Sequence, residues 1–332
     1  MAGFSLLDLV PVVAGGSVSQ ALANAADLAR HAEARGFTRY WIAEHHGMNL
    51  AGAATAVVIG HVAAATTRIR VGAGGIMLPN HAPLAIAEQF GTLDALFPGR
   101  IDLGLGRAPG SDMRVAQALR RTLTADPDGF PHDVMELQSY FADDGRTGIR
   151  AMPGAGAQPM LWILGSSLYG AQLAAALGLP YAFASHFAPD ALDEALLVYR
   201  RHFRPSAMLA RPYVAAGFNV IGADSDAEAD LLATSQAQAF VALRTGQPIA
   251  LPPPLPGYRE SLPPSHRAML DHVLQCSAIG GPATLARQIA AFLERTGADE
   301  LMIASSIFDH QARKHSLTLA AEAMRAVETV AA

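Results

Sequence analysis

Short β-like runs alternate with longer helical patterns along the whole 332-residue chain, and this alternation limits the possible folds more than any other feature. Runs typical of strands stand at 4–10, 40–43, 70–74, 101–106, 160–164, 181–185, 213–221 and 299–305. Alternating strands and helices favour a parallel sheet with helices packed outside it. Eight such units favour closure into a (β/α)8 TIM barrel, and a doubly wound open sheet is the competing arrangement.

The segments between these runs carry start and stop signals of helices. Apolar residues spaced three and four apart from Val18 to Ala32 predict a first helix, and Gly36 is placed to end it. Pro83 suits the first turn of a helix that ends before 97–99. Further helices are predicted at 53–67, 113–121, 132–141, 169–177, 190–203, 226–243 and 311–330.

The length suits one barrel domain with loop insertions over residues 1–332, because a barrel needs roughly 250 residues. Hydrophobic residues make up 51% of the chain and charged residues 16%, against about 25% charged in an average domain. This balance indicates a large apolar interior and is consistent with an apolar interface in a homo-oligomer.

Charge and composition exclude several classes of partner. The net charge is −5 and no basic cluster is present, so no nucleic acid is expected to bind. No uninterrupted apolar run reaches the length of about 18 residues that a membrane span needs. Cys276 is the sole cysteine, so no intramolecular disulfide forms, and no signal peptide is recognised at the N-terminus. A cytoplasmic location is therefore expected.

One segment interrupts the alternation of strands and helices. Residues 244–264 hold seven prolines, which are incompatible with a regular helix or a central strand. The segment is either a surface connector or a lid over the barrel mouth, since long loops in barrels often cover the site.

Two clusters follow the second and third predicted strands, where a barrel places its chemistry. Glu44, His45 and His46 come first, and neighbouring residues of a strand point to opposite sides, so the two histidines are not expected to chelate one metal ion. A histidine at the mouth carries a proton or bonds a ring, or it has a structural role. The glycines from Gly72 to Gly75 allow a ligand close to the backbone, or form an ordinary turn.

Two further clusters follow the fourth and fifth predicted strands. The segment 104–110 has the spacing G-x-G-x-x-x-G, which does not fit the dinucleotide-binding fingerprint. Arg107 remains as a cation suited to a phosphate or to a structural salt bridge. Ser166 and Ser167 follow Gly165 at a predicted helix start, which suits an anion or plain helix capping.

Taken together, five segments resemble the bacterial-luciferase-like family of flavin-dependent oxidoreductases. The matching stretches, in the order of the family, are YWIAEHH at 40–46, VGAGGIMLP at 71–79, LFPGRIDLGLGR at 96–107, LGSS at 164–167 and GADELM at 297–302. The stretches GRAPG at 106–110 and ASHF at 184–187 are similar to one branch of that family.

The resemblance implies a luciferase-like barrel, usually a dimer, that binds FMN or reduced FMN at its mouth. His45 matches the active-site histidine beside the isoalloxazine ring, and His186 matches a residue that lines the ring pocket. Gly74 and Gly75 match a non-prolyl cis peptide against the flavin. The positions that match the surroundings of the FMN phosphate are Arg107, Gly165, Ser166 and Tyr169.

The function that the resemblance implies is a flavin-dependent monooxygenase. Reduced FMN arrives as a co-substrate from a separate flavin reductase, and O2 supplies the oxygen that enters a small apolar or carbonyl substrate. His45 and His186 are the expected catalytic residues, and no metal is expected. The alternatives are hydride transfer with deazaflavin F420 and a non-catalytic flavin-binding protein.

Overall fold

The computed structural model describes residues 2–107, 113–119 and 129–331, and these residues contain nine strands in one sheet. All strand pairs in the sheet are parallel. The strands are β1 (Gly3–Asp8), β2 (Arg39–Ile42), β3 (Arg70–Met77), β4 (Ile101–Gly106), β5 (Met160–Gly165), β6 (Tyr181–Phe183), β7 (Val214–Gly222), β8 (Ser277–Gly280) and β9 (Glu300–Ala304).

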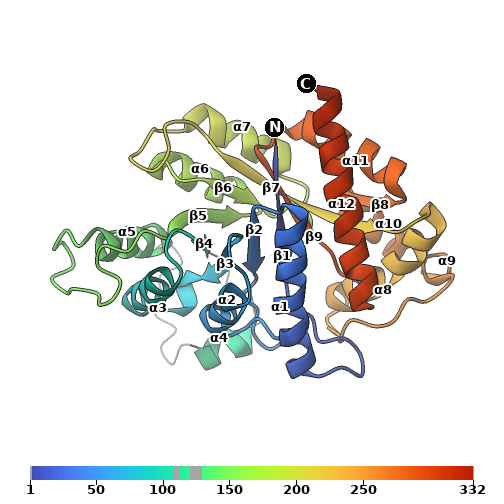
Figure 1. The fold of residues 1–332 in the computed structure, drawn as a ribbon, viewed down its shortest axis with the longest axis horizontal. Helices are drawn as coiled ribbons and strands as arrows, with labels where there is room; N and C mark the ends of the chain where they lie inside the picture. The colour runs from blue at the N-terminus through green and yellow to red at the C-terminus, as the bar shows by residue number, and fades with distance from the viewer. Residues whose placement is uncertain (1, 108–112, 120–128, 332) are drawn as a thin grey trace.

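The sheet closes on itself. Its order is β6-β5-β4-β3-β2-β1-β9-β7-β8, and β6 also pairs with β7, which completes a ring of eight strands (Figure 1). The predicted (β/α)8 TIM barrel is therefore confirmed, and the open doubly wound sheet is excluded. Each of the eight predicted runs corresponds to one strand of the ring, with ends that differ by at most three residues.

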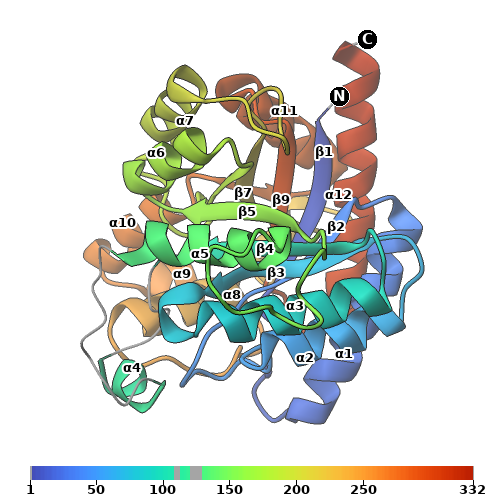
Figure 2. The same cartoon turned by 90° about the vertical axis from the view of Figure 1, so that its left-hand side faces the viewer.

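Helices surround the ring, as the two perpendicular views show (Figures 1 and 2). The last helix packs against the first one and closes the outer layer. The helices are α1 (Val18–Arg35), α2 (Thr55–Ala64), α3 (Pro83–Leu96), α4 (Met113–Leu119), α5 (Phe130–Ala142), α6 (Leu168–Leu177), α7 (Leu192–His202), α8 (Asp226–Arg244), α9 (Tyr258–Ser261), α10 (Pro264–Val273), α11 (Pro282–Thr296) and α12 (His310–Ala331), with a 3-10 turn η1 (Leu78–Asn80).

The helix signals read from the sequence are confirmed at the end of α1 and at the start of α3, and the structure adds a cap at the start of α1. Ser17 caps α1 by accepting a hydrogen bond from the backbone N–H of Gln20 at 3.1 Å. Gly36 ends the helix with φ of 88°, a left-handed conformation that glycine adopts without steric cost. Pro83 occupies the first turn of α3, where its missing N–H removes no helical hydrogen bond.

The structure corrects the sequence analysis between residues 258 and 298. The strand β8 and the helices α9, α10 and α11 were not predicted, so the run at 299–305 forms the ninth strand rather than the eighth. β8 has only four residues and pairs with β7 beyond the point where β6 ends. The single turn α9 forms between Pro256 and Pro263, inside the segment that was expected to hold no helix. The predicted helix at 113–121 is present as α4, and its last two residues lie outside the described part of the chain.

The floor of the barrel interior is polar. Alternate side chains of a strand point inward, and Arg39 at the start of β2 points inward to two buried carboxylates. Its Nη1 donates to Oδ2 of Asp102 at 2.9 Å, and its Nε donates to Oε1 of Glu300 at 3.0 Å. These groups lie at the amino ends of the strands, which is the end of a barrel devoted to stability.

Above the floor the interior is filled first by large apolar side chains and then, toward the carboxyl ends of the strands, mostly by small ones. Trp41 and Trp162 meet edge to face with ring centroids 5.0 Å apart, and both are fully buried. Two residues further along, the inward positions of β1 and β5 carry Leu9 and Leu164, but those of five other strands carry small side chains or none. These positions are Ala43 on the end of β2, Gly106 in β4, Ala184 after β6, Gly217 in β7 and Ala304 in β9. The taper leaves room for a ligand at the carboxyl end of the barrel.

No helix of the described residues is long and apolar enough to span a membrane.

Candidate active site

Five segments with predicted site residues follow five neighbouring strands. Because β2, β3, β4, β5 and β6 lie in that order in the ring, their carboxyl ends form one continuous arc of the mouth. Four spacings of about 4.8 Å make an arc of about 19 Å, which leaves room for a ring, a ribityl chain and a phosphate laid across it. The residues on the arc are His45 after β2, Gly74 and Gly75 in β3, Arg107 after β4, Gly165 and Ser166 at the end of β5, and His186 after β6.

Arg107 and Tyr169 meet between β4 and α6. The guanidinium carbon of Arg107 lies 4.1 Å from the centroid of the Tyr169 ring, and the arginine side chain is exposed. Stacking on an aromatic face fixes the plane of a guanidinium while its N–H groups stay able to bind an anion. Two of the four residues that the resemblance assigned to the phosphate are therefore in contact.

The start of α6 lies beside this pair, because Gly106 of β4 pairs with Leu164 of β5. Ser167 is the N-cap residue of α6, but its side chain makes no capping hydrogen bond. Plain helix capping, the alternative function of this serine pair, does not occur here. The exposed Ser166 precedes the first turn of α6, which holds the Tyr169 ring under Arg107, and a helix N-terminus favours an anion.

Gly74 and Gly75 are joined by a cis peptide bond, as the resemblance implied. The pairing of β3 with β4 shifts its register between Ala73 and Ile76, which locates the irregularity at this bond. A Cβ atom on Gly75 would lie 2.6 Å from the carbonyl oxygen of Gly104, and one on Gly74 would lie 2.7 Å from a methyl group of Leu7. No side chain fits at either position, so the surface above these glycines stays flat.

Glu44 is a buried anchor that the sequence analysis named without giving it a role. Its Oε1 accepts hydrogen bonds from Nε2 of His46 and Nε2 of His81, both at 2.8 Å. Its Oε2 accepts from the backbone N–H of Met77 at 3.0 Å, at the end of β3. Burial alone would raise the pKa of Glu44, but these hydrogen bonds and the charge of His81 outweigh burial and hold the pKa below its ordinary value. Glu44 thus connects the segment that carries His45 to the segment that follows the glycine pair.

The same three side chains could hold a divalent cation. The ligand atoms of Glu44, His46 and His81 lie within 4.8 Å of one another, and a carboxylate with two imidazoles is a donor set typical of transition metals. His45 does not belong to this group, in agreement with the expectation that neighbouring histidines do not chelate one ion. The sequence analysis missed His81 because it lies 37 residues beyond Glu44 and no local motif connects them.

His186 is a neutral histidine in the wall of the mouth. Burial, followed by the nearby charge of His45, lowers the pKa of His186 to about 4. Its Nδ1 is buried and has no hydrogen-bond partner among the described residues. A buried nitrogen without a partner is costly, and this one lies against the backbone of Gly217 in β7.

β7 fixes the position of His186. A Cβ atom on Gly217 would lie 2.2 Å from Nδ1 of His186, so only glycine leaves space for the imidazole. The side-chain amide of Asn219 donates to the carbonyl oxygen of His186 at 2.8 Å. These contacts were invisible in the sequence, because β7 is more than thirty residues away along the chain.

Cys276 is excluded as a nucleophile. Its side chain is fully buried, and burial raises the pKa of the thiol above its ordinary value despite the nearby charge of Arg295. The thiolate is the reactive form of cysteine, so a buried thiol with a raised pKa is inert.

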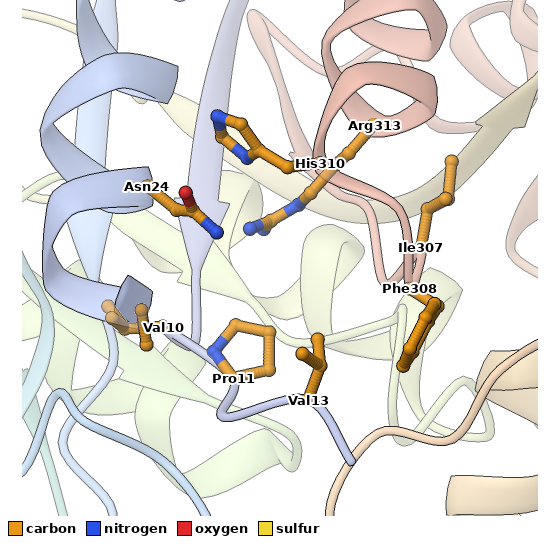
Figure 3. Close-up of a pocket in the computed structure, with 9 residues that line it drawn as sticks. Val10, Pro11, Val13, Asn24, Ile307, Phe308, His310 and Arg313 are labelled. Carbon is orange, nitrogen blue, oxygen red and sulfur yellow. The ribbon is translucent and has the colours of Figure 1, made fainter. Parts of the chain in front are cut away.

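A small cavity lies outside the ring, between the loop after β1 and the start of α12 (Figure 3). Its volume is about 20 Å³, which is room for about one water molecule. Arg313 borders it and binds Oδ1 of the buried Asp8 at 2.8 Å. This cavity is too small for a substrate, and its charged groups serve to join β1 to α12.

The fold and the mouth define a class of protein: a TIM barrel with a stacked arginine beside a helix N-terminus and two histidines on one arc. Residues 4–300 match the family model described as luciferase-like monooxygenase. A luciferase-like monooxygenase of Escherichia coli strain K12 is 54% identical over 319 residues, which cover 96% of this chain and 95% of that protein.

Solved structures agree with this relationship. Apo-MsnO8 superposes with a TM-score of 0.91 at 34% identity and covers 98% of this chain and 99% of its own. The oxygenating constituent of 3,6-diketocamphane monooxygenase from Pseudomonas putida, in complex with FMN, shares the fold with a TM-score of 0.72 at 19% identity and covers 97% of each chain. The chain belongs to the luciferase-like monooxygenase family, whose members are flavin-dependent oxidoreductases.

Proposed function

We propose that this protein is a monooxygenase that uses reduced FMN and O2 to oxygenate a small apolar or carbonyl substrate. When bound, reduced FMN supplies two electrons and two protons, so that one atom of O2 enters the substrate and the other leaves as water. Reduced FMN comes from a separate flavin reductase in this proposal, and the active form is a homodimer.

The observation that carries the proposal is the order of the site segments along the mouth. Arg107 stacked on Tyr169, next to the first turn of α6, fits a phosphate by charge and by hydrogen-bond donors. At the other end of the arc His45 and His186 lie near each other, since the charge of His45 lowers the pKa of His186, and both can border a tricyclic ring. The residues present therefore fit FMN at both of its ends.

The two histidines have different roles in this proposal. His186, with a pKa of about 4, is neutral at pH 7 and cannot act as an acid there, so in this proposal it borders the ring without exchanging a proton. His45 lies in the loop three residues beyond β2, close enough to His186 for its charge to lower the pKa of that residue. It is the group that would move a proton at the reacting centre.

Replacing the phosphate cation tests the proposal directly. Arg107→Met keeps a long side chain that can pack on the Tyr169 ring, but it removes the positive charge. Loss of a charge-assisted contact of about 1.5–3 kcal/mol should weaken FMN binding about 10- to 100-fold. Riboflavin, which has no phosphate, should bind equally to the wild type and to the variant. Arg201→Met, at an exposed arginine of α7, is the matched control and should leave both affinities unchanged.

The competing functions give different results in the same titrations. Binding of F420 without binding of FMN would point to hydride transfer and would refute the use of FMN. Tight binding of FMN, with no oxygenated product from any substrate when a reductase, NADH and O2 are supplied, would point to a non-catalytic flavin-binding protein. If Arg107→Met lost affinity for FMN and for riboflavin equally, Arg107 would not bind the phosphate.

A further inference from the structure

A second cavity, of about 130 Å³, lies at the mouth on the side away from Arg107. We infer that it is the substrate chamber, and that it selects an uncharged, mainly apolar molecule about the size of one aromatic ring. This inference rests on the proposed function, because it assigns the substrate to a space beside the flavin site. The lining residues are Leu9, Pro11, Met48, Asn49, Leu50, Gln236, Ala239, Phe240, Leu243, Pro248, Ile249, Leu251 and Ser306.

The cavity continues the interior of the barrel. Leu9 lies two residues beyond Leu7, on the same side of its strand, and packs against the interior cluster that contains Trp41 and Trp162. Ser306 stands two residues beyond Ala304 at the end of β9 in the same way. Since β9, β1 and β2 are neighbours in the ring, the cavity opens beside the strand that leads to His45.

The loops after β1 and β2 form one wall as a unit. Pro11 and Leu50 are bridged in antiparallel fashion, and the backbone N–H of Val12 donates to the carbonyl oxygen of Asn49 at 3.0 Å. The backbone N–H of Ala51 donates to the carbonyl oxygen of Val10 at 2.9 Å. This wall is therefore formed before any ligand binds.

One face of α8 forms the opposite wall. Gln236, Ala239, Phe240 and Leu243 have the spacing i, i+3, i+4 and i+7, which places them on a single side of a helix. Nε2 of Gln236 donates to Oδ1 of Asn219 at 2.8 Å, and Asn219 in turn holds the backbone of His186. The wall of the chamber is thus connected to the histidine segment of the flavin site.

The Pro-rich segment forms the roof. Leu251 is bridged to Val13, and its carbonyl oxygen accepts from the backbone N–H of Ala14 at 2.8 Å. Nε2 of Gln238 in α8 donates to the carbonyl oxygen of Pro253 at 3.0 Å, which holds the other side of the segment. Of the two functions left open by the sequence, connector or lid, these contacts favour a lid.

The lining determines the class of substrate. None of its thirteen residues is charged, and its only polar side chains are Asn49, Gln236 and Ser306. A charged substrate would lose its hydration here without gaining a partner of opposite charge, which is costly. A cavity of about 150 Å³ lined by apolar side chains accepts benzene, and the volume here is similar.

The test uses the full chain saturated with FMN and two fluorinated probes followed by 19F NMR. The neutral probe is 4-fluorotoluene, and the charged probe of similar size is 4-fluorobenzoate. We expect 4-fluorotoluene to bind and 4-fluorobenzoate not to bind. Ala239→Leu, which places three further carbon atoms in the cavity, should weaken binding of 4-fluorotoluene at least 10-fold. Ala242→Leu, on the same helix but outside the lining, is the matched control and should bind like the wild type.

A second variant changes the size limit in the other direction. Phe240→Ala should admit 2-fluoronaphthalene, which the wild type should exclude. The inference is overturned if 4-fluorotoluene does not bind the FMN-loaded wild type, if Ala239→Leu binds it unchanged, or if FMN and 4-fluorotoluene displace each other. Loss of FMN binding itself would instead refute the proposed function, and fluorescence quenching of FMN measures that separately.

Discussion

The lowered pKa of His186 predicts that this one histidine makes the fold sensitive to mild acid. An ordinary histidine has a pKa of 6.5, and the folded protein holds that of His186 at about 4. Between these values the unfolded chain binds a proton that the folded chain does not bind, so stability falls as the pH falls through 6.5 toward 4. Above pH 6.5 both states are neutral at this residue and its contribution is constant.

The magnitude follows from the pKa difference. The difference between 6.5 and about 4 corresponds to about 3 kcal/mol once both states are fully protonated. Between pH 7.5 and pH 5.0 the wild type should lose about 2 kcal/mol of unfolding free energy through His186 alone. Other titrating groups add to the measured change, and a variant that lacks this imidazole removes only the contribution of His186.

The assay is urea unfolding of the wild type and of His186→Gln at pH 7.5 and at pH 5.0. The variant should lose about 2 kcal/mol less than the wild type between the two pH values, whatever its stability at pH 7.5. His202→Asn, at an exposed histidine of α7, is the control and should lose as much as the wild type. Equal losses in the wild type and His186→Gln would refute the reasoning, because the imidazole would then titrate normally in the folded state.

Two further predictions separate the floor of the barrel from its mouth. Asp102→Asn removes a carboxylate that accepts from Arg39 at 2.9 Å and leaves a buried cation less compensated, so unfolding in urea should show a loss of about 3–5 kcal/mol while FMN affinity stays unchanged. Gly75→Ala places a Cβ atom 2.6 Å from the carbonyl oxygen of Gly104, so it should cost about 1–3 kcal/mol in the same assay and also weaken FMN binding. Gly60→Ala is its control, because a Cβ atom at that position of α2 meets nothing closer than 3.6 Å. Unchanged FMN binding in Gly75→Ala would contradict the assignment of a flat cofactor surface to Gly74 and Gly75.

The barrel could be predicted from the sequence because its strands are buried on both sides and separated by well-marked helices. The failures lie where that contrast weakens. The strand β8 has only four residues, and although their burial alternates, the sequence SAIG is too short to show an apolar alternation. Helix α11 could have been found, since Leu285, Ile289 and Phe292 repeat at helical spacing between Pro282 and Gly297, which mark its start and end.

The places of the candidate residues along the strand ends could be predicted from the sequence, but their contacts could not. Strand ends and motifs located His45, Arg107 and His186, because parallel strands bring their carboxyl ends together. They could not show that Glu44 binds His81, since that contact depends on how two loops fold over each other. The pKa of His186 likewise depends on burial against a neighbouring strand, which no local pattern records.

The taper of the barrel interior explains how one fold holds both a rigid core and a cofactor hollow. Small inward residues such as Ala43 and Ala304 leave space at the mouth, but they also remove packing contacts from the upper half of the ring. The lower half compensates with large and charged groups: the Trp41–Trp162 pair and the carboxylates around Arg39. Stability and ligand binding therefore depend on different layers of the same strands. A larger residue at the mouth should lower the affinity for flavin more than it lowers the unfolding free energy. A cavity in the floor should instead lower the unfolding free energy while the affinity for flavin stays unchanged.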